Sequence, residues 1–236
     1  MRKILLFVTA IGCVALLSAV AHAQCGVIGG ECLDDPSFEL ATSGGQTSNS
    51  DWVLTTNFPS GMAPVDPGAQ FQTGAFAASD GATGVWFRGF EGIQNVGEPP
   101  VDADITQVVT VPAPGTYQLT FDSAREIVWT AAGFDAILSS SSGPSVTLDL
   151  NAATYNDTGN MESNPTMFSL LLPGVLAGDT LTVSVVVDDA IDNKDIPQGG
   201  RSAFVDNFSL SRVPEPACIA LGLIGLLGLM GLVRHR

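Results

Sequence analysis

Hydrophobic and polar residues alternate in short runs over much of the chain. In residues 115–122 every second residue is apolar, beginning at Tyr117, and residues 179–187 repeat the pattern from Leu181. A period of two is typical of a β-strand with one face buried. The same reasoning predicts strands at 51–56, 84–90, 104–111, 134–138, 145–150, 166–172 and 203–212.

No stretch between residues 24 and 213 shows the 3.6-residue period of an amphipathic helix, and clusters of Gly, Pro, Ser, Asn and Asp separate the runs. About nine or ten strands of this length and spacing predict an all-β fold, a two-sheet antiparallel sandwich. Residues 57–84 carry little pattern, so we expect a loop or flap there.

The N-terminal end has the organisation of a secretory signal. Met1–Lys3 is basic, residues 4–20 are apolar, and Ala21-His22-Ala23 is a small-x-small cleavage site. We therefore expect residues 1–23 to be removed, so that a sandwich domain spanning 24–212 is exported with Gln24 as its first residue.

The C-terminal end, residues 213–236, combines a short hinge, an uncharged apolar run at 217–233 and a basic terminus with Arg234 and Arg236. Seventeen residues as a helix cover about 25 Å, near the lower limit for crossing a bilayer. The arrangement predicts one C-terminal transmembrane helix whose end stays in the cytoplasm.

Pro214, Glu215 and Pro216 precede the apolar run, and this order resembles the PEP-CTERM sorting signal of Gram-negative bacteria. The resemblance implies recognition and processing by an exosortase-like enzyme at the cell envelope. The alternative is a plain single-pass anchor that is never cut, which would not need Pro-Glu-Pro at the membrane edge.

The part expected to be exported is strongly acidic. Of the 24 acidic residues only Glu215 lies outside 24–213, and of the 9 basic ones only five lie inside, which leaves a formal charge of −18. Such a field repels nucleic acid and anionic lipid and attracts cations. We therefore expect no nucleic-acid partner. The acidic residues Asp188, Asp189, Asp192 and Asp195 follow a strong strand and lack EF-hand spacing, which favours a solvated loop over an ion site.

Two cysteines remain in the exported part, Cys25 and Cys32, with three glycines between them. In an oxidising compartment this spacing favours a small disulfide loop at the new N-terminus. A metal site is the alternative, but it would need more ligands nearby and the exported part has no histidine.

Four segments in order are similar to the galactose-binding-like jelly rolls, a group with many carbohydrate-binding modules. They are Asp35-Pro36-Ser37-Phe38-Glu39 followed by Trp52, the aromatic segment 84–90, the hairpin 105–121 and the closing segment 204–210. The resemblance covers about residues 33–212 and implies the fold more than sugar binding, because such folds host many functions.

In the predicted strand at 203–212, Asp206 lies on the same face as Phe204, Phe208 and Leu210, and this face is expected to face the core. A buried carboxylate needs a partner or a cation. The resemblance implies a structural Ca²⁺ between the first and last strands, held by Glu39 and Asp206, and hard oxygen ligands suit that ion. The alternatives are that a bulge turns Asp206 outward or that it accepts hydrogen bonds from backbone amides.

Aromatic and acidic residues are the candidates for ligand binding and catalysis. Trp129 is the best candidate platform for stacking on a sugar, whereas Trp52 and Trp86 lie among apolar neighbours and are expected in the core. A Ser-His-Asp set is excluded because the exported part lacks histidine. Asp122 and Glu126 could act as the two catalytic carboxylates of a glycosidase. In a domain with so many carboxylates, however, some pair always has a suggestive spacing.

We therefore expect a non-enzymatic exported protein of the bacterial envelope or extracellular matrix, associated with exopolysaccharide or the cell surface. A specific carbohydrate-binding module is the first alternative, and a polysaccharide hydrolase is the second. The membrane, through the C-terminal helix, and an exosortase-like enzyme are the other expected partners.

Overall fold

The computed structural model describes residues 25–41, 49–57, 68–73, 78–88, 101–126, 129, 131–155, 165–190 and 202–215. The expected signal peptide, Gln24, Pro216, the apolar run at 217–233, Asp192 and Asp195 lie outside these residues. Within the described ranges we find no helix with the length and hydrophobicity needed to cross a lipid bilayer.

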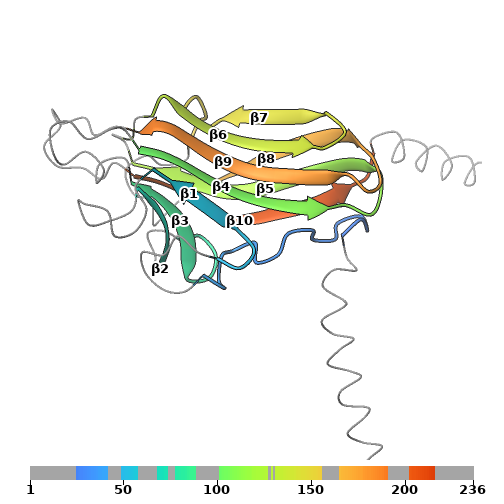
Figure 1. Ribbon diagram of the computed structural model, residues 1–236, viewed down its shortest axis with the longest axis horizontal. Helices are drawn as coiled ribbons and strands as arrows, with labels where there is room; N and C mark the ends of the chain where they lie inside the picture. The colour runs from blue at the N-terminus through green and yellow to red at the C-terminus, as the bar shows by residue number, and fades with distance from the viewer. Residues whose placement is uncertain are drawn as a thin grey trace, which may run out of the picture.

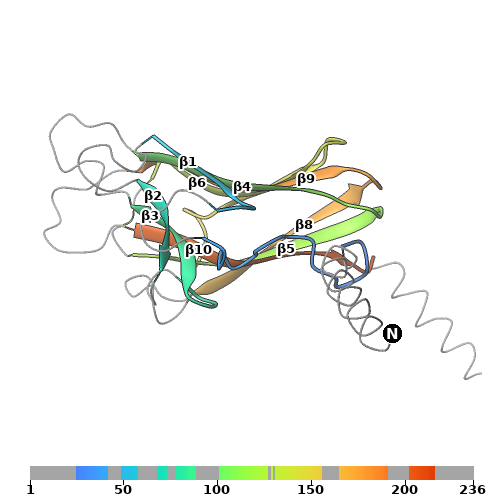
Figure 2. The same ribbon diagram turned by 60° about the horizontal axis from the view of Figure 1, so that its bottom comes forward.

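In the part of the chain that the structure describes, ten antiparallel strands form two five-stranded sheets, ordered β1-β4-β9-β6-β7 and β2-β3-β10-β5-β8. Figure 1 looks onto the first sheet, and Figure 2 shows the two layers edge on. This confirms the all-β, two-sheet antiparallel sandwich predicted from the alternation, and the jelly-roll fold that the resemblance implies. The strands are β1 (Val53–Thr56), β2 (Ala69–Thr73), β3 (Thr83–Arg88), β4 (Val101–Thr110), β5 (Gly115–Arg125), β6 (Gly133–Ser140), β7 (Ser145–Asp149), β8 (Thr166–Val175), β9 (Thr180–Ala190) and β10 (Ser202–Val213).

The core lies between the sheets and is built by the inward residues of each alternating strand. Leu54, Ile105, Val185 and Ala136 occupy one row across the first sheet, and all four are buried. The second sheet contributes Tyr117, Leu119 and Phe121 from β5. Burying one face of each sheet while the other stays polar is what the period of two predicts.

Strand β2 corrects the expectation of a structureless segment at 57–84. Ala69 and Phe71 face the core and are fully buried, and β2 pairs along its whole length with β3. The strand has a single large hydrophobic residue, so its own sequence carries almost no periodic signal. Pairing with β3 and the burial of Phe71 supply the stabilisation that local sequence does not show.

Both ends of the described chain meet at one end of the sandwich. Ile28 bridges to Arg212, and the backbone N–H of Gly29 donates to the carbonyl oxygen of Arg212 at 2.9 Å. Glu31 reinforces this junction, because its Oε1 accepts from the N–H of Leu210 at 2.9 Å and its Oε2 from the hydroxyl of Ser209 at 2.6 Å. The first segment is therefore tied to the last strand.

Cys25 and Cys32 form a disulfide, with Cα atoms 4.5 Å apart. The loop that it closes is packed on Pro112, whose side chain leaves no room for a Cβ at Gly26. The bridge therefore holds the N-terminal loop against the turn between β4 and β5.

Replacing both cysteines with serine should lower the free energy of unfolding by about 2 kcal/mol, because the unfolded chain regains the entropy of a short loop. Urea denaturation of the exported chain measures this loss, and a reducing agent should reproduce it in the unsubstituted protein. Labelling of both cysteines by a thiol reagent in the folded protein would contradict the prediction.

Candidate functional site

One row of outward-facing residues crosses the first sheet at the same height. The strand register aligns Thr55, Asp104, Val186, Asp135 and Asp149 on β1, β4, β9, β6 and β7. Since adjacent strands lie about 4.8 Å apart, the backbones of Asp104 and Asp135 are about 10 Å apart with Val186 between them. The row thus places two carboxylates on either side of a small apolar surface.

The next outward positions toward the strand ends are also polar. Asn57 binds the start of β4, because Asp102 N–H donates to Asn57 Oδ1 at 3.0 Å and Asn57 N–H donates to the carbonyl oxygen of Asp102 at 3.1 Å. Asp188 lies opposite Gly133 on β6, where the lack of a side chain leaves space. A cleft of about 470 Å³ results, lined by Thr55, Thr56, Asn57, Asp102, Ala103, Asp104, Gly133, Asp135, Val186, Val187 and Asp188.

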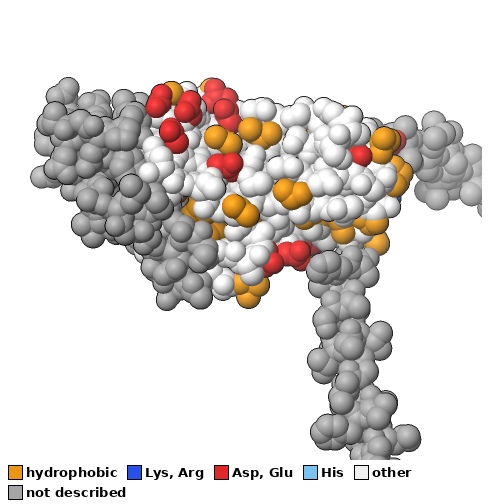
Figure 3. Space-filling view, in the orientation of Figure 1, with side chains coloured by type: hydrophobic (Ala, Val, Ile, Leu, Met, Phe, Trp, Pro, Cys, Tyr) orange, Lys and Arg blue, Asp and Glu red, His pale blue; other side chains and the backbone are white. Residues whose placement is uncertain are grey.

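The cleft is electronegative. In Figure 3 many of the acidic side chains on this face gather at the end of the sheet where β4 begins and β9 ends. Partial burial raises the pKa of Asp135 above its usual value, and the negative charge of Asp149 raises it further. Hydroxyl groups of a ligand could donate hydrogen bonds to these carboxylates, whereas an anionic ligand would be repelled.

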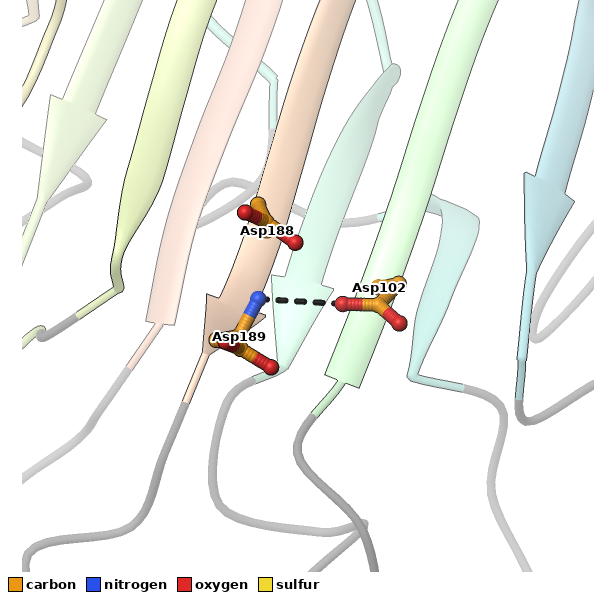
Figure 4. Close-up of side chains that lie close together, drawn as sticks. All are labelled: Asp102, Asp188 and Asp189. Carbon is orange, nitrogen blue, oxygen red and sulfur yellow. Dashed lines mark hydrogen bonds between the residues drawn. The ribbon is translucent and has the colours of Figure 1, made fainter.

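Asp102, Asp188 and Asp189 form the tightest acidic group at this end, with one oxygen of each within 4.8 Å of the others. Figure 4 shows that the backbone N–H of Asp189 points at Asp102, and it donates to Asp102 Oδ1 at 3.0 Å. Asp188 and Asp189 belong to strand β9 and not to a loop after it, but all three side chains are exposed, so each carboxylate can be hydrated. Their oxygens are close enough together to coordinate a cation, but no other observation on the described residues at this position indicates a bound ion.

Asp206 and Glu39 both bind one loop, residues 79–83. Asp206 Oδ2 accepts from the backbone N–H groups of Ser79 at 2.6 Å and Asp80 at 2.9 Å. Glu39 Oε1 accepts from the N–H groups of Ala82 at 2.8 Å and Thr83 at 2.9 Å. The two residues predicted as calcium ligands therefore anchor successive amides of the same loop.

A β-bulge corrects the expected orientation of Asp206. The register of β10 against β5 shifts between Asp206 and Ser209, and Asn207 has a φ of 51°. Asp206 therefore pairs with the outward Asp122, while Phe208 and Leu210 face the core. Asp206 is nevertheless fully buried because the loop at 79–83 covers it.

Burial raises the pKa of Asp206 to about 7, although hydrogen bonds from Asp80, Asn207 and Ser79 act in the opposite direction. The four hydrogen bonds that its oxygens accept come from N–H and O–H groups of these residues. Three of the four donors are backbone N–H groups, which cannot coordinate a cation, so this arrangement does not fit Ca²⁺ unless the loop turns carbonyl oxygens inward. Calcium binding by Glu39 and Asp206 stays a prediction.

The tryptophans differ from the expectations in two cases. Trp129 is only 7% exposed and packs edge-to-face on Phe134 with ring centroids 5.7 Å apart, so no open ring face is available for stacking on a sugar. Trp52 is in the core, as expected. Trp86 is half-buried on the outward side of β3, because Val85 and Phe87 on either side of it take the core positions.

The candidate catalytic pair does not reach the cleft. Asp122 Oδ2 accepts from the hydroxyl of Ser79 at 2.9 Å and from Asn207 Nδ2 at 3.1 Å. Glu126 Oε2 accepts from the N–H of Ser202 at 2.8 Å, and burial raises its pKa. Both carboxylates are thus engaged with the β2–β3 loop and β10, and neither lines the cleft.

The sequence reasoning missed the cleft residues Asp104 and Asp135. Each occupies an outward position in a predicted strand, and this signal was visible in the sequence. Only the register of β9 between β4 and β6 shows that the two carboxylates share a row.

No protein-family model matches the sequence, and the search of curated proteins finds no match. Among solved structures, the chain is similar to a family 61 carbohydrate-binding module in complex with β-1,4-galactotriose. That match has 19% identity and a TM-score of 0.45, and covers 77% of this chain and 98% of the other. A family 35 carbohydrate-binding module from Clostridium thermocellum matches with 14% identity, a TM-score of 0.35 and coverage of 67% and 90%.

The cleaved adhesin domain of Lys-gingipain from Porphyromonas gingivalis is also similar, with 11% identity, a TM-score of 0.43 and coverage of 75% of this chain and 96% of the other. At these identities the likeness concerns the fold, so we infer function only from the residues of this chain.

Proposed function

We propose that this chain is an exported, non-catalytic protein of the bacterial cell surface or matrix whose cleft binds a neutral polysaccharide. The observation that carries the proposal is the row Thr55, Asp104, Val186, Asp135, which places hydrogen-bonding side chains around an apolar centre. Carboxylates accept hydrogen bonds from sugar hydroxyls, and Val186 offers a contact for the apolar face of a sugar ring. Saturable binding of the exported chain to neutral polysaccharides tests the proposal.

The charge of the domain favours a neutral ligand over an anionic one. The exported part carries a formal charge of −18, and the cleft itself holds Asp102, Asp104, Asp135 and Asp188. An acidic polysaccharide would meet repulsion both at long range and inside the cleft. A neutral chain that is rich in hydroxyl groups avoids this penalty and still offers donors to the carboxylates.

A polysaccharide hydrolase has less support because its candidate pair, Asp122 and Glu126, lies outside the cleft. The separation of Asp104 and Asp135 is nevertheless of the order that a water-activating carboxylate pair uses. Cleavage of a bound polysaccharide is therefore the outcome that would establish the second function.

The two ends of the chain support export and sorting. Pro214 and Glu215 are exposed and follow directly on the last residue of β10. We propose that an exosortase-like enzyme reads Pro214, Glu215 and Pro216 and removes the apolar run at 217–233. The chain would then be released from the inner membrane to the outer surface, where it would associate with exopolysaccharide.

The Glu215→Ala variant should remain uncut, because the motif loses its one charged side chain at the membrane edge. Intact-mass spectrometry of envelope fractions should show loss of residues 219–233 from the natural chain and their retention in the variant. The Asp34→Ala variant, which removes an exposed carboxylate and keeps the motif, is the control and should be processed normally. A natural chain whose mass still includes Arg236 would contradict this prediction.

A further inference from the structure

The cleft and the start of the C-terminal tail lie at opposite ends of the sandwich. Strand β4 begins beside the cleft at Val101 and reaches Thr110, next to the turn at 112–114. Ten residues of strand span about 30 Å. Strand β10 runs from Ser202 to Val213, with Ala203 opposite Arg125 and Val213 opposite Thr116. Figure 2 shows both strands running lengthwise from one end of the sandwich to the other.

Large apolar side chains are exposed at the tail end. Val27, Ile28 and Leu176 are 60%, 56% and 57% exposed, and we call these three residues the apolar rim. Ile28 bridges to Arg212, three residues before Glu215. The turn that follows Leu176 is held to the same end, because Gly178 N–H donates to the carbonyl oxygen of Val111 at 2.8 Å.

The sequence limits how far this rim can be from the apolar run at 217–233. Glu215 and Ala217 are separated by two Cα–Cα steps of about 3.8 Å, so at most about 8 Å of chain connects the end of the described domain to the run. If that run enters a bilayer, the tail end of the sandwich must lie at the lipid surface.

We infer that, while the tail is intact, the apolar rim rests on the lipid surface and the cleft faces away from it. The inference extends the membrane-anchored stage of the proposed function. Three exposed apolar side chains suit the boundary between headgroups and acyl chains. The acidic cleft end is held about 30 Å from anionic lipid headgroups, which would repel it, and is open to polysaccharide outside the membrane.

Tryptophan fluorescence in vesicles tests the orientation. The full chain is reconstituted in phosphatidylcholine vesicles with and without brominated acyl chains, as the Ile28→Trp variant or the Met167→Trp variant. Met167 is the matched control because it is 71% exposed and lies opposite Asp122, seven residues along β5 from the tail end. Flotation with the vesicles is measured first, on the same samples.

Brominated lipid should quench the emission added by the Ile28→Trp variant by about half or more, because a rim residue lies at the depth of interfacial side chains. It should leave the emission added by the Met167→Trp variant unchanged. Flotation with no quenching of either variant, or with equal quenching of both, would overturn the orientation while leaving the anchor in place. Failure to float would show that the membrane-anchored stage itself is wrong, and the inference would fall with it.

Discussion

The Asp206→Ala variant should lower the free energy of unfolding by about 3 kcal/mol, because two buried backbone N–H groups lose their hydrogen-bond acceptor. These are the N–H groups of Ser79 and Asp80, and Asn207 N–H loses its bond to Asp206 Oδ1 as well. Urea denaturation of the exported chain at pH 7 measures the loss. The Asp188→Ala variant removes an exposed carboxylate from β9 and should change stability by less than about 0.5 kcal/mol.

The same carboxylate should make stability depend on pH. Since burial raises the pKa of Asp206 to about 7, the folded state binds more protons than the unfolded state between about pH 4 and pH 7. This contribution is complete below the unfolded pKa and is lost as the pH rises through 7. The Asp206→Asn variant lacks it, so its destabilisation relative to the natural chain should be larger at pH 5 than at pH 8. If the difference in free energy of unfolding between the two proteins were the same at pH 5 and pH 8, Asp206 would not be a buried carboxyl group with a raised pKa.

The effect of calcium on stability distinguishes two roles of the Asp206 carboxylate, which are coordination of Ca²⁺ and acceptance of hydrogen bonds from the loop amides. Melting curves of the natural chain are recorded in chelator and in millimolar calcium. A rise in melting temperature that the Asp206→Ala variant abolishes would establish the site at Glu39 and Asp206, because binding to the folded state alone stabilises it. Overlapping curves would leave the amides of the loop at 79–83 as the partners of both carboxylates.

Removing the two cleft carboxylates that flank Val186 should weaken polysaccharide binding by about thirtyfold or more, since each lost hydrogen-bond acceptor costs about 1 kcal/mol or more. The variant is Asp104→Ala with Asp135→Ala. Both side chains are only partly exposed and point outward from β4 and β6, so the fold should be retained. The control, Asp34→Ala with Asp51→Ala, removes the same number of charges outside the cleft and should bind normally.

The local pattern of the sequence was sufficient for the strands with several alternating apolar residues. Tyr117, Leu119 and Phe121 define β5, and Leu181, Val183 and Val185 define β9, because in each case one whole face must be buried. Strand β2 was missed because Phe71 is its only large apolar residue, and its pairing with β3 is a long-range property.

The candidate sites depended on features that a single strand does not encode. The alternation with Phe208 and Leu210 predicted that Asp206 faces the core. A bulge after Asp206 reverses the alternation of β10. The only residue that hints at this bulge is Asn207, which adopts a left-handed backbone conformation. Trp129 lies seven residues beyond the predicted strand at 115–122, so no alternation of apolar residues predicts which way its side chain faces. Only its contact with Phe134 in the structure shows that it is buried. Asp104 and Asp135 meet only through the register of β9.

Binding of the exported chain to a panel of neutral and acidic polysaccharides, measured by titration calorimetry, tests the central claim most directly. We predict saturable binding to at least one neutral polysaccharide, no binding to the acidic ones, and loss of binding in the variant with Asp104→Ala and Asp135→Ala but not in its control. Equal binding by the natural chain and the cleft variant, or shortening of the polysaccharide during the titration, would contradict a non-catalytic module that binds through this cleft.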